Sequence, residues 1–145
     1  MSTAIEAHLQ ELRDRQALQD VMLRYAAGVD ERDFALYRSC FAADVEVLDF
    51  GPEPFHGVDA WVAHVEQALA AFAATQHLLS PQHAVIDGDR AVTRSDVQAL
   101  HTLADAPDTT FILWATYETE MDRVDGDWRI SRHRLVPRFS RTQGP

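Results

Sequence analysis

Histidine side chains carry most of the acid–base capacity of this chain, because imidazole is the side chain that titrates near neutral pH. The sequence has seven histidines: His8, His56, His64, His77, His83, His101 and His133. None of them forms a His-x-His or His-Glu-x-x-His spacing, and the single cysteine, Cys40, excludes a cysteine cage for a metal. We therefore expect no metal and no cofactor. A metal site stays open only if strand histidines converge on one point.

Three of the histidines in segments with strand-like patterns are candidates for a site. His101 shares its strand face with apolar residues, so it is either a core histidine with a local partner or a pocket residue. His133 belongs to a polar row on the last strand, which either lines a cavity or faces water. His77 follows the change from helix to strand, where its ring is either held by neighbours or directed into a cleft.

Asp30 ends the first predicted helix on the side of its apolar stripe, where a carboxylate needs a partner or a function. It either caps the turn toward Asp33, pairs with Arg32, or faces a site. Tyr25 lies five residues earlier, which is about 140° around an ideal helix. Tyr25 and Asp30 therefore reach one cavity only if the helix ends or distorts near Gly28.

The first half of the chain has helical spacing. Apolar residues recur at helical intervals from Ile5 to Val29 and again from Trp61 to Phe72, where Asp59 can cap the helix. Asp33 can cap a short helix over residues 34–41, and residues 44–50 alternate as a short strand. We expect three helices from this half of the chain.

The second half of the chain changes to strand-like periodicity. Segments 77–86, 91–103, 111–123 and 128–139 are rich in β-branched and aromatic residues. Asp87-Gly88 and Asp125-Gly126 separate them, and Asp-Gly between such segments indicates a hairpin. Helices followed by strands predict an α+β fold, with the helices packed on one face of a curved antiparallel sheet.

Length and charge exclude several kinds of partner. The chain has 145 residues, enough for one domain over 1–145 with its own core. Its 23 acidic and 13 basic residues give a net charge of −10, which repels a phosphate backbone and argues against nucleic-acid binding. No apolar segment reaches the roughly 18 residues that span a bilayer. Residues 1–10 lack a signal-peptide pattern, so we expect a cytoplasmic protein without a membrane partner.

Several short motifs resemble the SnoaL-like branch of the nuclear-transport-factor-2-like superfamily, and the likeness extends over about residues 5–139. These motifs are residues 18–21 (LQDV), 24–33 (RYAAGVDERD), 40–45 (CFAADV), 75–77 (TQH), 86–91 (IDGDRA) and 125–130 (DGDWRI). The resemblance implies a cone-shaped α+β barrel, in which three helices and a strongly curved antiparallel sheet enclose an apolar pocket. Within the superfamily, the chain is most similar to the group of scytalone dehydratase, the bile-acid 7α-dehydratases and hexachlorocyclohexane dehydrochlorinase.

The resemblance also implies a catalytic set. Asp30 and His77 fall on the acid–base pair of that group, with His77 as the base and Asp30 as the residue that orients it. Tyr25 and His101 would donate hydrogen bonds to a developing enolate oxygen or to the leaving group. His133 falls near a pocket position that is Asn or Arg in the relatives, which leaves the substrate open. The expected substrate-binding wall consists of His133, Phe50, Trp61, Phe72, Leu79 and Trp114.

The resemblance favours a cofactor-independent lyase, of the dehydratase or dehydrohalogenase type, that acts on a small apolar ring-containing molecule. Phe50 lies in the strand where scytalone dehydratase has a water-binding tyrosine pair, so scytalone itself is not the expected substrate. Two alternatives remain: a double-bond isomerase or polyketide cyclase with the same fold, and a non-catalytic module that binds a small molecule. The relatives also associate through the outer face of the sheet, so we expect a homodimer or homotrimer.

Overall fold

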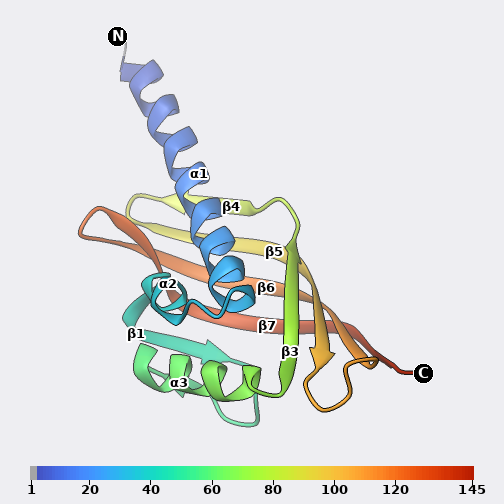
Figure 1. The fold of residues 1–145 in the computed structure, drawn as a ribbon. Coiled ribbons are helices and arrows are strands. Elements are labelled where there is room, and N and C mark those ends of the chain that lie inside the picture. The colour runs from blue at the N-terminus through green and yellow to red at the C-terminus, as the bar shows by residue number, and fades with distance from the viewer. Residues whose placement is uncertain (1–2) are drawn as a thin grey trace.

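A long first helix, α1 (Thr3–Asp30), carries Asp30 to the sheet, while its N-terminal half projects beyond the sheet (Figure 1). The computed structural model describes residues 3–145, so Met1 and Ser2 lie outside the described residues. Two further helices follow, α2 (Phe34–Ser39) and α3 (Val58–Leu69). Among the described residues, no helix combines the length and the hydrophobicity needed to cross a membrane.

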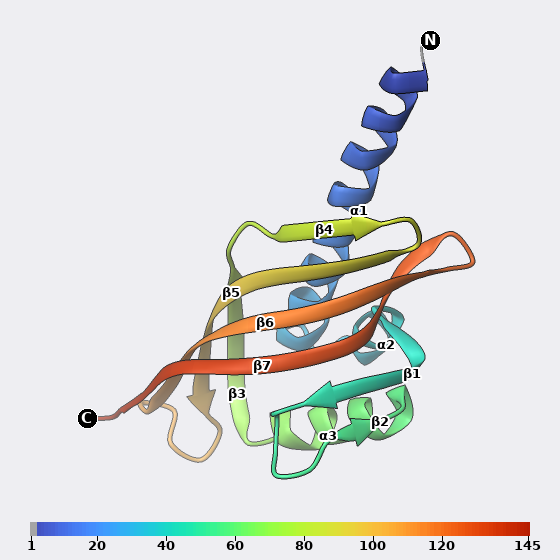
Figure 2. The ribbon, with the colours of Figure 1, turned by 180° about the vertical axis from the view of Figure 1, so that it is seen from behind.

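Seven strands of the described residues form one curved sheet, which is seen from its outer face in Figure 2. They are β1 (Phe41–Leu48), β2 (Phe55–His56), β3 (Phe72–Leu79), β4 (His83–Asp87), β5 (Arg90–Leu103), β6 (Thr110–Val124) and β7 (Asp127–Gln143). The strand order is β2-β1-β7-β6-β5-β3, and β4 pairs with β5 beside β3. The predicted α+β cone is confirmed, with a sheet that does not close between β2 and β3 within residues 3–145.

One strand pair departs from the antiparallel expectation. β1 runs parallel to β7, with Val47 opposite His133, so the sheet is mixed. Every other neighbouring pair is antiparallel. The parallel pair was beyond local prediction, because most of the chain lies between these two strands and no turn sets their relative direction.

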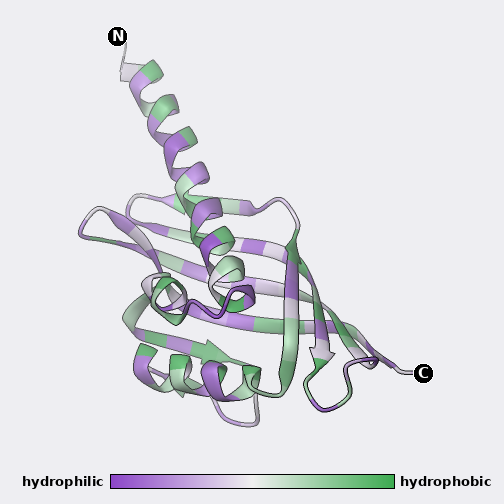
Figure 3. Ribbon diagram, in the orientation of Figure 1, coloured by the Kyte–Doolittle hydropathy of each residue, from purple (hydrophilic) through white to green (hydrophobic). Residues whose placement is uncertain are grey.

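Several local predictions are confirmed. The Asp33 side chain caps α2 by accepting a hydrogen bond from the backbone N–H of Leu36 at 3.0 Å. Asp125 and Gly126 both have positive φ, 51° and 87°, as the two-residue turn of the β6–β7 hairpin requires. Hydrophobic and hydrophilic bands alternate along the long strands (Figure 3), and in β5 buried and exposed residues alternate with the same period.

Three local predictions are wrong. Phe72 was expected on the third helix, but that helix ends at Leu69 and Phe72 begins β3. The third helix is also preceded by Gly57 rather than capped by Asp59, which lies in its first turn. The expected strand over 77–86 is two strands, because the chain breaks pairing between Leu79 and His83, where Pro81 lies.

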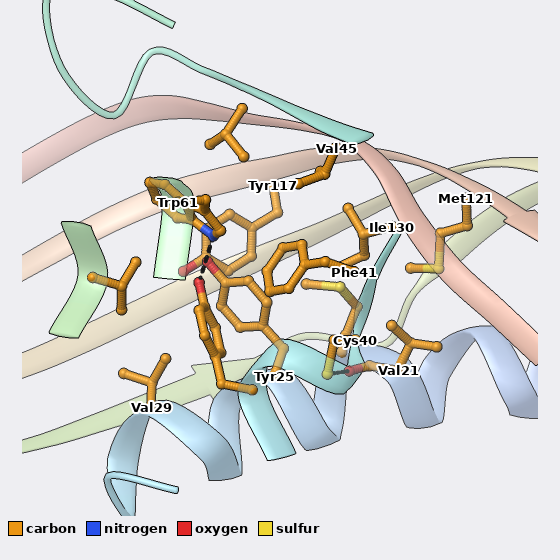
Figure 4. Close-up of a cluster of buried hydrophobic side chains, with 14 of the residues drawn as sticks. Val21, Tyr25, Val29, Cys40, Phe41, Val45, Trp61, Tyr117, Met121 and Ile130 are labelled. Carbon is orange, nitrogen blue, oxygen red and sulfur yellow. Dashed lines mark hydrogen bonds between the residues drawn. The ribbon is translucent and has the colours of Figure 1, made fainter. Parts of the chain in front are cut away.

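The core lies between the helices and the concave face of the sheet, as Figure 4 shows for Tyr25, Phe41, Trp61 and Tyr117. Tyr25 packs edge-on against Tyr37, with ring centroids 4.9 Å apart, and the Trp61 indole N–H donates to the Tyr37 hydroxyl at 3.0 Å. These aromatic contacts attach α1, α2 and α3 to one another and to the sheet.

Candidate active site

Asp30 and His77 meet where the end of α1 contacts β3. Oδ1 of Asp30 lies 2.8 Å from Nδ1 of His77, and Oδ2 accepts the backbone N–H of His77 at 2.8 Å. The carboxylate thus holds the residue by both its ring and its backbone. The side chains are shielded but reachable from solvent, with exposed fractions of 9% for His77 and 18% for Asp30.

The charges in this pair favour an ionised carboxylate and a defined ring tautomer. Burial acts to raise the pKa of Asp30, but the hydrogen bonds from the His77 ring and backbone outweigh it and lower that pKa below its ordinary value. An ionised carboxylate only accepts, so Nδ1 of His77 carries the proton. In the neutral ring, Nε2 is then left with a free lone pair, which is the arrangement a general base needs.

His101 lies beside this pair on β5. Its ring packs edge-on against the His77 ring, with the centroids 5.9 Å apart, and it also contacts Phe72 and Phe111. Nδ1 donates to the carbonyl oxygen of Phe111 at 3.2 Å, and burial lowers the pKa of His101. Neutral His101 therefore offers Nε2 as an acceptor, which differs from the donor role expected from the sequence.

Tyr25 and His133 form a second hydrogen-bonded pair, distinct from the Asp30–His77 pair. The Tyr25 hydroxyl lies 3.1 Å from Nε2 of His133, and both residues are buried. Burial raises the pKa of Tyr25 well above its usual range and lowers that of His133 to about 3. Because α1 stays helical through Asp30, the side chains of Tyr25 and Asp30 point in different directions. The contact between Tyr25 and His133 was not predicted from the sequence.

The expected wall residues divide into two groups. Phe50 stacks on His133, with the ring centroids 5.2 Å apart, and it also contacts Trp61. The ring centroid of Phe72 lies 4.6 Å from that of His101. Leu79 shares its strand face with His77 and is half-buried against the core. The first group therefore has five members, which lie on or pack against the concave side of the sheet: His133, Phe50, Trp61, Phe72 and Leu79.

Trp114 does not belong to this wall. Its ring packs against Phe139, and it lines a cavity of about 610 Å³ that also contacts Leu78, Arg94 and Arg138. This cavity lies on the outer face of the sheet, because Trp114 is one position from the inward-facing Ala115 on β6. Trp114 was predicted as a wall residue from its side-chain type alone, and side-chain type does not distinguish the two faces of the sheet.

Two further residues, which the sequence analysis did not assign to the site, extend the hydrogen bonding of the Asp30 carboxylate: Thr75 bonds it directly, and Arg32 bonds Thr75. The Thr75 hydroxyl donates to Oδ1 of Asp30 at 3.0 Å, and Arg32 donates to that hydroxyl at 2.9 Å. Thr75 lies two residues before His77, which placed it on the same strand face and was a usable signal. Arg32 was considered only as a direct partner of Asp30, and its contact with Thr75 had no local signal because it joins residues 43 positions apart. Residues 3–145 contain no cluster of three or more potential metal ligands.

Comparison with known proteins assigns the chain to a family. Residues 10–134 match the SnoaL-like domain model, and the chain therefore belongs to the SnoaL-like family. No curated protein matches the chain. Among solved structures, a Kribbella flavida protein is 27% identical with a TM-score of 0.82, and the match covers 90% of this chain and 95% of the other.

Two further structures share the fold. A protein named as a candidate scytalone dehydratase, from Novosphingobium aromaticivorans, is 24% identical with a TM-score of 0.82, covering 97% of this chain and 96% of the other. A hexachlorocyclohexane dehydrochlorinase from Novosphingobium barchaimii is 22% identical with a TM-score of 0.84, covering 94% of each chain. At this level of identity, these two likenesses establish the fold.

Proposed function

We propose that the protein is a cofactor-independent lyase that eliminates water or hydrogen halide from a small apolar ring-containing molecule. The observation that carries the proposal is the 2.8 Å contact between Oδ1 of Asp30 and Nδ1 of His77, which leaves Nε2 of His77 as a free base. The names of two structural relatives, a candidate dehydratase and a dehydrochlorinase, support this reaction class.

In the proposed reaction, Nε2 of His77 removes a proton from a carbon of the substrate. The electron pair of that C–H bond forms the new double bond, and the leaving group departs from the adjacent carbon with its own bonding pair. The Asp30 carboxylate stabilises the imidazolium that forms. A hydroxide leaving group takes the proton from His77 to become water, whereas a halide leaves as an anion and the proton passes to solvent.

An apolar substrate fits the surroundings of this pair. Phe72 and Phe111 flank His101, and both are half-buried rather than fully packed, as is Phe50. Aromatic side chains with remaining accessible surface on the concave side favour a flat apolar ring as ligand. Acid–base residues placed among such side chains act on a substrate that is shielded from water.

The proposal is tested by turnover of a panel of hydroxylated and halogenated ring compounds. Product mass, halide release and absorbance of the new double bond report elimination. His77→Gln should lower kcat by about 10²–10⁴-fold, the usual contribution of a general base. His83→Gln is the matched control, because His83 is exposed on β4, and it should leave turnover unchanged.

Two results would overturn the lyase proposal. A product that keeps all substrate atoms but has a moved double bond would identify an isomerase. Binding of ring compounds without turnover, equally tight in wild type and His77→Gln, would identify a binding module.

We also propose that the outer face of the sheet pairs with a second copy of the chain. Leu78 and Phe139 are exposed there near the Trp114 ring, Val92 is exposed on the same face of β5, and exposed apolar side chains of this kind favour burial. Light scattering should give a mass at least twice that of one chain, which is 16.3 kDa. Trp114→Glu should lower that mass to the monomer value, and a monomeric wild type would contradict the proposal.

A further inference from the structure

Arg32 occupies a backbone position that ordinarily belongs to glycine. Its φ is 58°, and the backbone N–H groups of Arg32 and Asp33 bond back to Val29 and Gly28 at 3.2 and 2.9 Å. This is the pattern that ends many helices, with the left-handed residue just beyond the last turn. A side chain with a Cβ is disfavoured there, so an arginine at this position has a local cost that glycine would avoid.

The Arg32 side chain makes contacts that glycine cannot make. Nη1 donates to the carbonyl oxygen of Val29 at 2.6 Å and to the Thr75 hydroxyl at 2.9 Å. Nη2 is buried and has no hydrogen-bond partner within residues 3–145. A left-handed backbone and a buried unpaired nitrogen at one residue are both unfavourable for folding, and such features concentrate at functional sites.

The hydrogen bonds from Arg32 onward have only one possible direction. A guanidinium donates and never accepts, so the Thr75 oxygen accepts from Arg32. The single proton of the Thr75 hydroxyl is then free to point to Oδ1 of Asp30, 3.0 Å away. Oδ1 thus already accepts from Thr75 when it meets the His77 ring, where it accepts again from Nδ1.

We propose that Arg32 and Thr75 are positioning residues that hold the Asp30 carboxylate in the orientation in which it accepts from Nδ1 of His77 and leaves Nε2 as the base. This inference rests on the proposed function for its catalytic consequence, although the tautomer it concerns is measurable without a substrate. Neither residue contacts the reacting atoms. Their effect passes through the orientation and hydrogen bonding of the Asp30 carboxylate.

The variant Arg32→Gly separates this role from a purely structural one. Glycine suits a φ of 58°, so the midpoint of urea unfolding should stay the same or rise. The kcat should nevertheless fall about tenfold with little change in KM, because a small misplacement of a catalytic group has effects of this order or larger. Asp125→Gly is the matched control, because Asp125 also has a positive φ, 51°, in a turn far along the chain from this site.

The ring of His77 gives a readout that is independent of turnover. Nitrogen-15 NMR of the wild type should show a protonated Nδ1 and an unprotonated Nε2 in the neutral ring. In Arg32→Gly and Thr75→Val, the signals should move toward a mixture of tautomers. Thr75→Ser keeps the hydroxyl and should restore both the wild-type signals and the wild-type kcat, whereas Thr75→Val should not.

The outcomes separate this inference from the proposed function. Wild-type His77 signals in both Arg32→Gly and Thr75→Val would overturn the positioning role and leave the lyase proposal intact. Altered His77 signals, in a protein that turns over none of the ring compounds, would support the positioning role and count against the lyase. If Arg32→Gly lowers both the midpoint of urea unfolding and kcat, Arg32 only supports the fold.

Discussion

Tyr25 and His133 satisfy each other's polar atoms in the core, with the Tyr25 hydroxyl 3.1 Å from Nε2 of His133. The other ring nitrogen of His133 lies 3.0 Å from the Thr119 hydroxyl. Each ring nitrogen therefore has a neutral partner, and no charged group among residues 3–145 is hydrogen-bonded to the ring. This arrangement suits an uncharged imidazole, and it explains why burial holds the pKa of His133 down at about 3.

Stability should depend on His133 at mildly acidic pH. The unfolded chain binds a proton at this histidine below about pH 6.5, whereas the folded chain does so only near pH 3. The free energy of unfolding therefore has its full value above pH 6.5. It decreases as the pH falls toward 3, with a slope approaching about 1.4 kcal/mol per pH unit. Urea unfolding at intervals from pH 7 to pH 4 measures this slope, and His133→Gln should flatten it. An equally steep slope in the variant would assign the effect to other groups.

Tyr25→Phe should lower the free energy of unfolding, without a direct effect on kcat. The change leaves a buried nitrogen of His133 without its partner, at a cost of about 1–3 kcal/mol. The free energy of unfolding in urea measures the loss. Tyr37→Phe is a comparison within the same cluster, because it removes the acceptor of the Trp61 N–H instead. A large fall in kcat with unchanged stability would instead return Tyr25 to the catalytic role expected from the sequence.

His101 should discriminate between leaving groups. Its free Nε2 is an acceptor, so it can bind the hydroxyl of a substrate but gains no hydrogen bond from a halogen. His101→Leu should raise KM for hydroxylated rings about tenfold, equivalent to one hydrogen bond of about 1.4 kcal/mol. KM for halogenated rings should change little. Equal effects on both substrate classes would indicate that His101 only fills space.

Gly28→Ala should destabilise the protein although alanine is the better helix former. A Cβ at this position would lie 2.8 Å from the backbone nitrogen of Tyr37 and 2.9 Å from its Cα. Separating α1 from α2 to relieve this contact should cost about 1–3 kcal/mol, more than the helix propensity gained. Thermal unfolding measures the difference, and Gly51→Ala is the control, because nothing lies within 4 Å of its added Cβ. A more stable Gly28→Ala variant would contradict this packing.

The sequence predicted features that depend on near neighbours. The Asp33 cap, the Asp125-Gly126 turn and the long strands β5, β6 and β7 follow from residue types at short spacing. The expectation that Asp30 and His77 act together came from the family resemblance, and the structure places their side chains 2.8 Å apart. Their catalytic roles remain proposals.

What the sequence could not predict depends on distant segments. Thr75 meets Arg32 across 43 positions, and Tyr25 meets His133 across 108, so neither contact has a local pattern. Trp114 was misplaced because both faces of its strand carry apolar side chains, and periodicity then no longer distinguishes inside from outside. Phe72 continued a helical spacing by type, but the chain had already left the helix.

The parallel pairing of β1 with β7 has a consequence for how the chain reaches its native state. Val47 has its partner, His133, near the opposite end of the sequence. A ribosome must release almost the whole chain before this edge of β1 is paired, and loops of such length close slowly. Until β7 is available, the edge of β1 is unpaired and exposed, and chaperones bind exposed surfaces of this kind. Truncations after β6 should accumulate as aggregates rather than as smaller folded proteins.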